Sequence, residues 1–128
     1  MMKRVNFNSG SPWEDKVGYS RAVKVNNIIE VAGTTATKDG QIIGKDDPYI
    51  QAEFILSRIA GILQELGSNM SEVVRTRIYV VDIDHWKEIG KAHRKFFKNI
   101  KPASTMVEVN SLIDPDLLVE IEVTAVLN

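Results

Sequence analysis

Regularly spaced apolar residues predict a long amphipathic helix in the middle of the chain, over residues 48–66. Apolar side chains recur there at the i, i+3, i+4 and i+7 spacing that places them on one helical face. Asp47 is suited to cap the amino terminus, Pro48 to the first helical position and Gly67 to the carboxyl-terminal cap. The pattern therefore predicts both ends of this helix as well as its buried face.

A second amphipathic helix is predicted over residues 85–100. Asp84 can cap it, and Pro102 ends it because proline cannot continue the hydrogen-bond ladder of a helix. Trp86, at its start, is expected to belong to the core. The apolar face is expected to consist of Trp86, Ile89, His93, Phe96, Phe97 and Ile100.

Several other segments have the alternation, or the β-branched and aromatic composition, that is typical of strands. They are residues 3–7, 19–25, 28–37, 73–83, 104–110 and 118–126. Asn26 and Asn27 predict a two-residue hairpin turn between the second and the third. Residues 9–18 contain serine, glycine and proline and are expected to form a loop.

The resulting order, βββαβαββ, predicts an α+β fold in one domain over residues 1–128, with two helices on one face of a mixed sheet. On the other face, valines are mixed with residues of opposite charge. Water could cover such a face, but we favour a second copy of the chain, with the charges paired. Along residues 73–83 we expect Val74, Thr76, Ile78 and Val80 on one side and Val73, Arg75, Arg77, Tyr79 and Val81 on the other.

Composition excludes several classes of function. The 128 residues carry a formal net charge of −1, so nucleic acid is not an expected partner. The chain has no cysteine, which removes disulfides and thiolate chemistry and suits a reducing cytoplasm. The first residues lack the apolar segment of a signal peptide, and no apolar run approaches the roughly 20 residues that span a bilayer. We therefore expect a cytoplasmic protein without a membrane partner.

The titratable residues give no decisive catalytic pattern. His85 and His93 are about 12 Å apart along the predicted helix, too far to share a metal ion or a proton, and we expect no metal site. His93 is expected to be a hydrogen-bonded residue near the core, with catalysis as the alternative. Glu120 and Glu122 share a strand face at about 7 Å. They would be solvated or salt-bridged by default; the alternative is a carboxylate in a subunit cleft whose raised pKa suits proton transfer.

Six short segments, in this order and spacing, resemble the Rid family, also called YjgF. They are VGYSRAV (17–23), IIEVAGT (28–34), GSNMSEVVRTRIYVVDID (67–84), FF (96–97), PASTMVEV (102–109) and VEIE (119–122). The resemblance implies a homotrimer with a chorismate-mutase-like fold, a central barrel and ligand clefts between subunits. It also implies hydrolysis of reactive enamines and imines to a carbonyl compound and ammonia, without metal or organic cofactor. Other members have been described as ribonucleases, an activity that the near-neutral charge of this chain does not favour.

The same resemblance implies site residues. Tyr19 matches a pocket tyrosine, Gly33 a backbone turn at the cleft, and Glu120 the glutamate that positions the attacking water. The deaminating members carry an arginine that grips the substrate carboxylate, where this chain has Ser104. The neighbouring Thr105 takes a serine position. In the second helix, Gly90 replaces a frequent asparagine and His93 a tyrosine; we include both among the candidate substrate-binding residues.

Two interpretations remain open. In the first, the cleft hydrolyses an imine or enamine that lacks a carboxylate or holds it differently, with Arg21 as a replacement cation. Arg75 or Arg77 could also serve, although a salt bridge to Glu120 or Glu122 is the more expected role for them. In the second, catalysis is lost and the trimer binds a small metabolite or stabilises a partner protein. Its altered lining would then include Trp13, Glu14 and His93.

Overall fold

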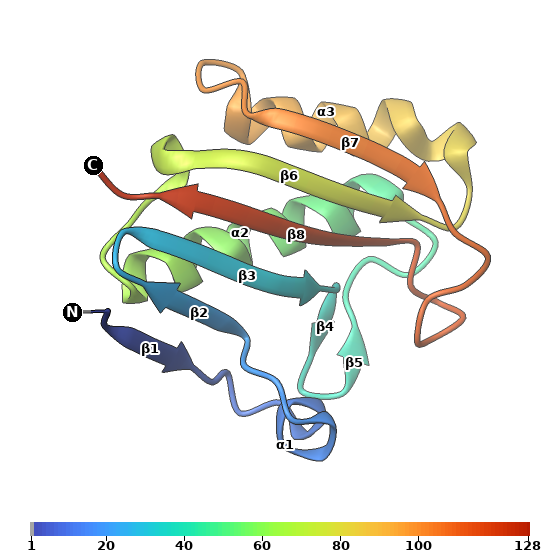
Figure 1. Ribbon diagram of the computed structural model, residues 1–128. Helices are drawn as coiled ribbons and strands as arrows, with labels where there is room; N and C mark the ends of the chain where they lie inside the picture. The colour runs from blue at the N-terminus through green and yellow to red at the C-terminus, as the bar shows by residue number, and fades with distance from the viewer. Residues whose placement is uncertain (1) are drawn as a thin grey trace.

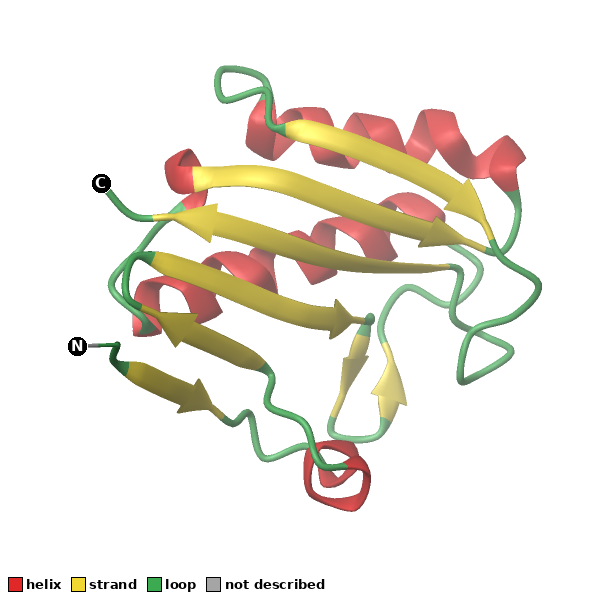
Figure 2. Ribbon diagram, in the orientation of Figure 1, coloured by secondary structure: helices red, strands yellow, loops and turns green. Residues whose placement is uncertain are grey.

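The computed structural model describes residues 2–128, and its main feature is a six-stranded sheet with two helices packed on one face (Figures 1 and 2). The helices are α2 (Pro48–Glu65) and α3 (Trp86–Phe97). The predicted α+β fold, with both long helices on the same face, is confirmed. No helix within residues 2–128 is long and apolar enough to cross a lipid bilayer.

The sheet is mixed, as the sequence predicts. In spatial order its strands are β1 (Arg4–Phe7), β2 (Ala22–Val25), β3 (Ile28–Thr34), β8 (Val119–Val126), β6 (Val73–Val80) and β7 (Ala103–Glu108). Strands β6 and β7 run parallel because α3 connects them as a crossover, and the other neighbouring pairs are antiparallel. Strand β8 therefore lies in the middle of the sheet and β7 at one edge.

Three of the predicted strands, over residues 28–37, 73–83 and 104–110, end earlier in the structure, the last at Glu108. Strand β3 stops at Thr34, and the chain continues into a separate hairpin of β4 (Thr37–Lys38) and β5 (Gln41–Ile42). Strand β6 stops at Val80, and short 3-10 helices flank it, η1 (Met70–Glu72) and η2 (Ile83–His85). The predicted cap Asp84 is wrong, because Asp82 accepts a hydrogen bond from the Asp84 N–H and caps η2, which leads directly into α3.

Residues 9–18 contain a short helix, α1 (Pro12–Val17), that the loop prediction misses. Pro12 lies in its first turn, and Glu14 and Asp15 place negative charge near the positive end of the helix dipole. Gly18 ends the helix with a φ of 87°, a left-handed conformation that glycine adopts readily. The proline and the glycine of this segment are thus helix boundaries.

The boundaries of α2 follow the sequence closely. Asp47 accepts a hydrogen bond from the Ile50 N–H at 3.0 Å through its Oδ1, and Pro48 opens the helix, as predicted. Gly67 has a φ of 82°, just beyond the end of the helix. These interactions satisfy backbone groups that the helix leaves free at its ends.

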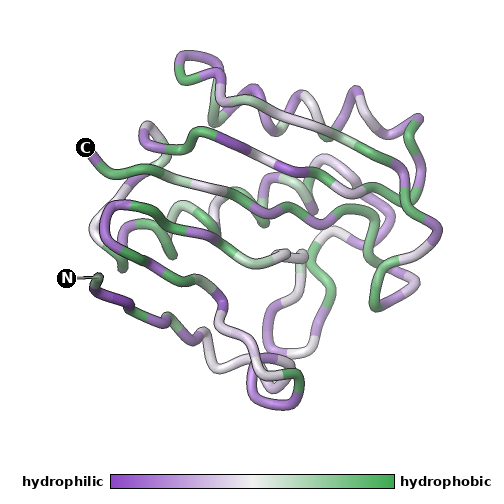
Figure 3. The backbone as a smooth tube through the Cα atoms, viewed as in Figure 1, coloured by the Kyte–Doolittle hydropathy of each residue, from purple (hydrophilic) through white to green (hydrophobic). Residues whose placement is uncertain are grey.

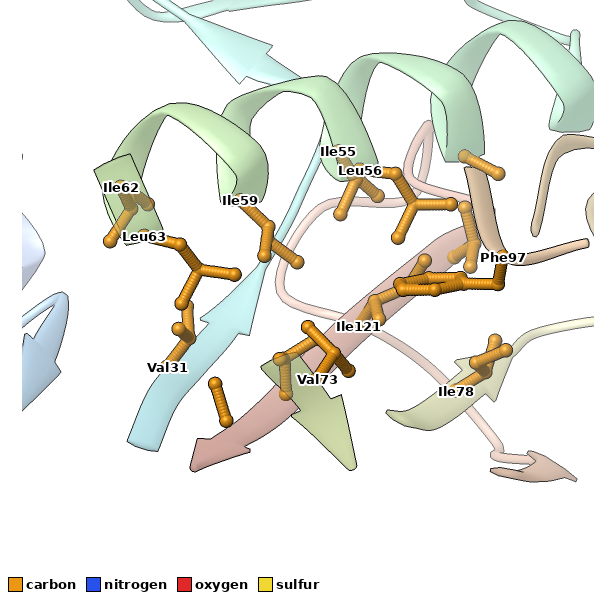
Figure 4. Packing of buried hydrophobic residues seen from close by; sticks show 14 of the residues in the cluster. Val31, Ile55, Leu56, Ile59, Ile62, Leu63, Val73, Ile78, Phe97 and Ile121 are labelled. Carbon is orange, nitrogen blue, oxygen red and sulfur yellow. The ribbon is translucent and has the colours of Figure 1, made fainter. Parts of the chain in front are cut away.

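The core lies between α2, α3 and the sheet (Figure 4). Ile55, Leu56, Ile59 and Leu63 project from α2 and are fully buried against β3, β6 and β8. Along β8, apolar and polar residues alternate (Figure 3), and the apolar ones are buried up to Ala125. Ile121 belongs to the core that packs against the helices (Figure 4). The opposite face of the sheet carries the polar residues, and no helical layer covers it within residues 2–128 (Figure 1).

Trp86 is not a core residue, contrary to the prediction. Its side chain is 54% exposed, with the Lys87 ammonium 5.8 Å from the ring centroid. The buried positions of α3 are Ile89, Ala92 and Phe97. The helix begins at Trp86, so contact with the core starts one turn further along the chain than the apolar pattern predicts.

The predicted faces of β6 are correct except at its start. Val73 is buried at 3% exposure, whereas Val74, which we expected inside, is 46% exposed. The register against β8 shifts between Val73 and Arg75, which shows a β-bulge at this position. One extra residue reverses the alternation on one side of the bulge, and a period-two pattern cannot foresee that reversal.

Candidate functional site

Glu120 and Gly33 meet where β8 passes the end of β3. The register of β3 against β8 shifts between Val31 and Thr34, so Gly33 lies in an irregular part of the strand. A Cβ atom at Gly33 would overlap with Oε2 of Glu120. The Glu120 carboxyl group therefore occupies the space that the side chain of any other residue would need.

The Glu120 side chain is partly buried and has no polar partner. Among residues 2–128, none of the hydrogen bonds or ion pairs involves its carboxyl oxygens. Burial is the main influence on this group and raises the pKa of the Glu120 carboxyl, the Arg21 guanidinium opposes the shift, and the Glu122 charge adds to it. A carboxyl group with a raised pKa and free oxygens is suited to accept and return a proton.

Arg21 connects Tyr19 to the backbone of Gly33. Its Nη2 donates to the Tyr19 hydroxyl oxygen at 3.0 Å, and its Nη1 donates to the Gly33 carbonyl oxygen at 2.6 Å and to the Thr34 hydroxyl oxygen at 3.2 Å. Arg21 is only 6% exposed. A role as the cation that holds substrate stays a prediction, and these contacts favour a role in positioning Tyr19.

Glu14 completes this cluster from α1. It is 4% exposed, and its Oε2 lies 3.5 Å from Nε of Arg21. The backbone N–H of Ser9 donates to Oε1 at 2.9 Å, and the Ser9 hydroxyl donates to Oε2. From the sequence, Glu14 is expected only as one of several residues that line the site. No spacing or periodicity could reveal the burial of Glu14, because it lies in a segment for which the sequence predicts a loop.

Arg77 forms the salt bridge that the sequence predicts for it. Its Nε lies 3.7 Å from Oε1 of Glu122, and the same oxygen accepts a hydrogen bond from the Tyr79 hydroxyl at 2.9 Å. Arg75 instead donates to the Thr105 hydroxyl oxygen at 2.8 Å. Glu122 is therefore the structural carboxylate of this strand face, and Glu120 is the one left free.

Ser104 belongs to a hydrogen-bonded chain on the helical side of the sheet. The Thr76 hydroxyl lies 2.7 Å from the Ser104 hydroxyl and 2.9 Å from Nε2 of His93. The His93 ring lies 4.6 Å from the Phe97 ring, and burial lowers the pKa of the His93 imidazole. Its predicted position, hydrogen-bonded near the core, is what the structure shows.

The predicted site residues lie on opposite faces of the sheet within one protomer. Ser104 pairs in register with Thr76, which is fully buried under the helices. Glu120 alternates with the buried Val119 and Ile121 and so faces the other way. One protomer therefore does not bring Ser104 to Glu120.

Gly90 and His93 line a hollow of about 520 Å³ at the carboxyl end of α3, together with Lys101 and Pro102. A larger hollow, of about 980 Å³, lies beside Tyr19 between α1 and the sheet face that has no helices. Trp13 is 50% exposed on α1. Within residues 2–128, no group of three or more histidine or acidic side chains is arranged to hold a metal ion.

Comparison with known proteins gives the family. A family model described as Endoribonuclease L-PSP matches residues 12–127. The chain belongs to this family. It is 36% identical over 117 residues to an uncharacterized protein of Streptomyces coelicolor, covering 91% of this chain and 87% of the relative. It is 34% identical to a RutC family protein of Pyrococcus abyssi, covering 98% of both chains.

A solved structure gives the same result for the fold. The Mycobacterium tuberculosis member of the YjgF/YER057c/UK114 family superimposes with a TM-score of 0.89 and is 45% identical. The match covers 98% of this chain and 100% of the other. The resemblance to the YjgF, or Rid, family that the sequence predicts is confirmed, and so is the fold.

Proposed function

We propose that this YjgF-family chain forms a homotrimer that binds a small metabolite between subunits and hydrolyses reactive imines or enamines to a carbonyl compound and ammonia. The observation that carries the proposal is the free carboxyl group of Glu120 over Gly33, with its raised pKa. Tyr19, held by Arg21, provides a hydroxyl group in the same cluster. No other acid in this cluster is free, because Glu14 is bound to Ser9 and Arg21.

The chemistry needs only water as a co-reactant. The Glu120 carboxylate takes a proton from a water molecule while the water oxygen forms a bond to the imine carbon, and the C=N electron pair moves to nitrogen. The protonated Glu120 then returns the proton to nitrogen, which gives a carbinolamine. Glu120 next takes the proton of the carbinolamine hydroxyl group and passes it to the same nitrogen, so the C–N bond breaks, its electron pair leaves with ammonia, and the O–H electron pair forms the carbonyl. The raised pKa of Glu120 suits these proton transfers.

The face of the sheet that carries Glu120 favours a site between subunits. This face has no helical layer, and Ser104 lies on the other face. A second copy of the chain could bring its own Ser104, Gly90 and His93 to the cluster of Tyr19 and Glu120. The homotrimer in this proposal supplies that second copy.

A second candidate function is binding without catalysis. It is favoured by Ser104, because a hydroxyl group that is bonded to Thr76 cannot replace the charge and the two-pronged geometry of an arginine. In this case the trimer would hold a metabolite, or stabilise a partner protein, and Glu120 would contribute only a hydrogen-bond acceptor.

The deciding experiment measures ammonia release from imines that an amino-acid oxidase generates in situ, over a panel of amino acids. We expect the native chain to accelerate the release and Glu120→Gln to lose most of this acceleration. A gain only in Ser104→Arg would mean that the cleft is intact and that residue 104 controls activity. If neither the native protein nor Ser104→Arg accelerates ammonia release from any substrate of the panel, catalysis on 2-imino acids is ruled out. An RNA-cleavage assay on the same proteins tests for the endoribonuclease activity that the family is named after.

A further inference from the structure

Glu14 and Arg21 form an ion pair that is almost completely removed from water, at 4% and 6% exposure. The other ion pair near the site, between Arg77 and Glu122, has side chains that are 39% and 32% exposed. Removing two charges from water is costly, so a buried pair needs other hydrogen bonds to be retained. Glu14 accepts them from Ser9, and Arg21 donates them to Tyr19 and Gly33.

Within residues 2–128, Arg21 is the cation that donates hydrogen bonds to both the Tyr19 hydroxyl and the Gly33 carbonyl. Glu14, 3.5 Å behind it, cancels its charge. When Glu120 is ionised, the cluster contains one guanidinium and two carboxylates, and therefore carries an excess of negative charge. A substrate carboxylate would enter this cluster against that charge, and Arg21, the guanidinium that the cluster contains, is already paired with Glu14.

The hollow beside Tyr19 is also lined by more acidic than basic side chains. Two guanidinium groups line it, from Arg4 and Arg77, and the second is already paired with Glu122. The carboxylates that line it belong to Glu14, Asp15, Glu30 and Glu122. The approach to Tyr19 therefore favours neutral and cationic molecules over anions.

We propose that Glu14 determines substrate specificity: by neutralising Arg21 inside the protein, it makes the site select imines without a carboxylate over 2-imino acids. This inference rests on the proposed function and names its substrate class. The substrates are imines, or protonated iminium ions, of simple amines, and hydrolysis gives an aldehyde or ketone and ammonia. Glu14 does not touch the substrate; it acts through Arg21.

The test compares two imines with the same side chain. An amine oxidase generates one from a primary amine, and an amino-acid oxidase generates the other from the matching amino acid. We expect the native protein to favour the amine-derived imine by about tenfold or more in kcat/KM. In Glu14→Gln the preference should fall by about tenfold, mainly through a lower KM for the 2-imino acid.

Two controls separate charge from structure. Glu65→Gln makes the same substitution at the exposed end of α2 and should leave the preference unchanged. The double variant Glu14→Gln with Arg21→Gln removes both charges of the pair and should restore the native preference, which a purely structural role of Glu14 would not do. A native preference for the 2-imino acid, or an unchanged preference in folded Glu14→Gln, would overturn the inference.

If the native protein hydrolyses neither imine, the proposed function fails. A binding measurement then tests the role of Glu14 separately. Titrations with 2-oxobutyrate and with butanone are followed by NMR in the native protein and in Glu14→Gln. About tenfold tighter binding of 2-oxobutyrate in Glu14→Gln, with butanone unchanged, would support the role of Glu14. Equal affinities for 2-oxobutyrate in the two proteins would refute it.

Discussion

The carboxyl group of Glu120 lies over Gly33, in the space that a Cβ atom would fill. The close approach joins the middle strand of the sheet to the end of β3, and the atoms that a Cβ of residue 33 would meet belong to the flexible side chain of Glu120. The two residues are distant in sequence. The position of the proposed catalytic carboxyl group thus depends on the absence of a side chain on the neighbouring strand.

Gly33→Ala should displace the Glu120 carboxyl group without unfolding the protein. The atom that must move is the end of a flexible side chain, so the free energy of unfolding should change little. Activity should fall by about 10- to 100-fold, because small displacements of catalytic groups have effects of this size. Imine hydrolysis and thermal unfolding would be measured together, with Gly61→Ala as the matched control.

Gly61 lies on the exposed side of α2 with open space around it. Its replacement by alanine should stabilise the protein by about 0.5–1 kcal/mol and leave activity intact, because alanine favours the helix. Full activity in Gly33→Ala would contradict the proposed geometry.

Glu120→Gln should become more stable relative to the native protein as the pH rises. Burial raises the pKa of Glu120 in the folded state above its unfolded value. The stability linked to this proton is therefore fully present below the ordinary pKa of glutamate and is lost as the pH rises through the raised pKa. Denaturant unfolding of both proteins from acid to neutral pH measures this difference.

Glu122→Gln serves as the comparison at neutral pH. Glu122 is bonded to Arg77 and Tyr79, so its loss should destabilise the protein at neutral pH. Equal losses of unfolding free energy in Glu120→Gln and Glu122→Gln at neutral pH would contradict the finding that the Glu120 carboxyl group is free.

Thr76→Val should destabilise the protein by about 1–3 kcal/mol, because it leaves buried polar atoms of His93 without a partner. The volume of the side chain hardly changes, so packing contributes little. Thr76→Ser keeps the hydroxyl group and should retain more of the stability. Equal stability of the valine variant and the native protein in urea unfolding would show that the chain from Ser104 to His93 is unimportant.

His93 should titrate below the ordinary pH range of histidine. Burial lowers the pKa of its imidazole in the folded state, so folding opposes protonation. The stability linked to this group is present above the unfolded pKa and is lost as the pH falls through the folded one. NMR titration of the ring protons, assigned with a His93→Gln variant, measures the pKa. A value at or above the ordinary range would indicate a carboxylate partner from another subunit.

Much of the fold could be predicted from local pattern. The helix that starts at Pro48 has its cap, its apolar stripe and its terminating glycine in the sequence, and the structure has all three. The alternation along Val119–Val126 correctly predicts which residues are buried. The predictions of burial fail at Trp86 and Val74, where a helix start and a β-bulge change which side chains meet the core, and the short helix α1 is missed.

The candidate site could be predicted only as a set of residues. Tyr19, Gly33 and Glu120 were expected together, and the structure brings them into one cluster with Arg21. Ser104 and His93 were expected there too, but within one protomer they lie on the other face of the sheet. Resemblance between sequences compares positions along a chain, and it does not say which face of one protomer a residue occupies.

The sequence by itself determined the two long helices, the strands of the main sheet, the helical face of the sheet and the family, because these depend on local periodicity and on ordered motifs. Only the tertiary structure decided that Glu14 is buried against Arg21, and that Glu120 is free while Glu122 is bonded. The physical reason is that burial and pairing of charges depend on contacts between segments that are distant in sequence. The sequence shows the same glutamate whether its carboxylate contacts water, an arginine or the backbone of a glycine.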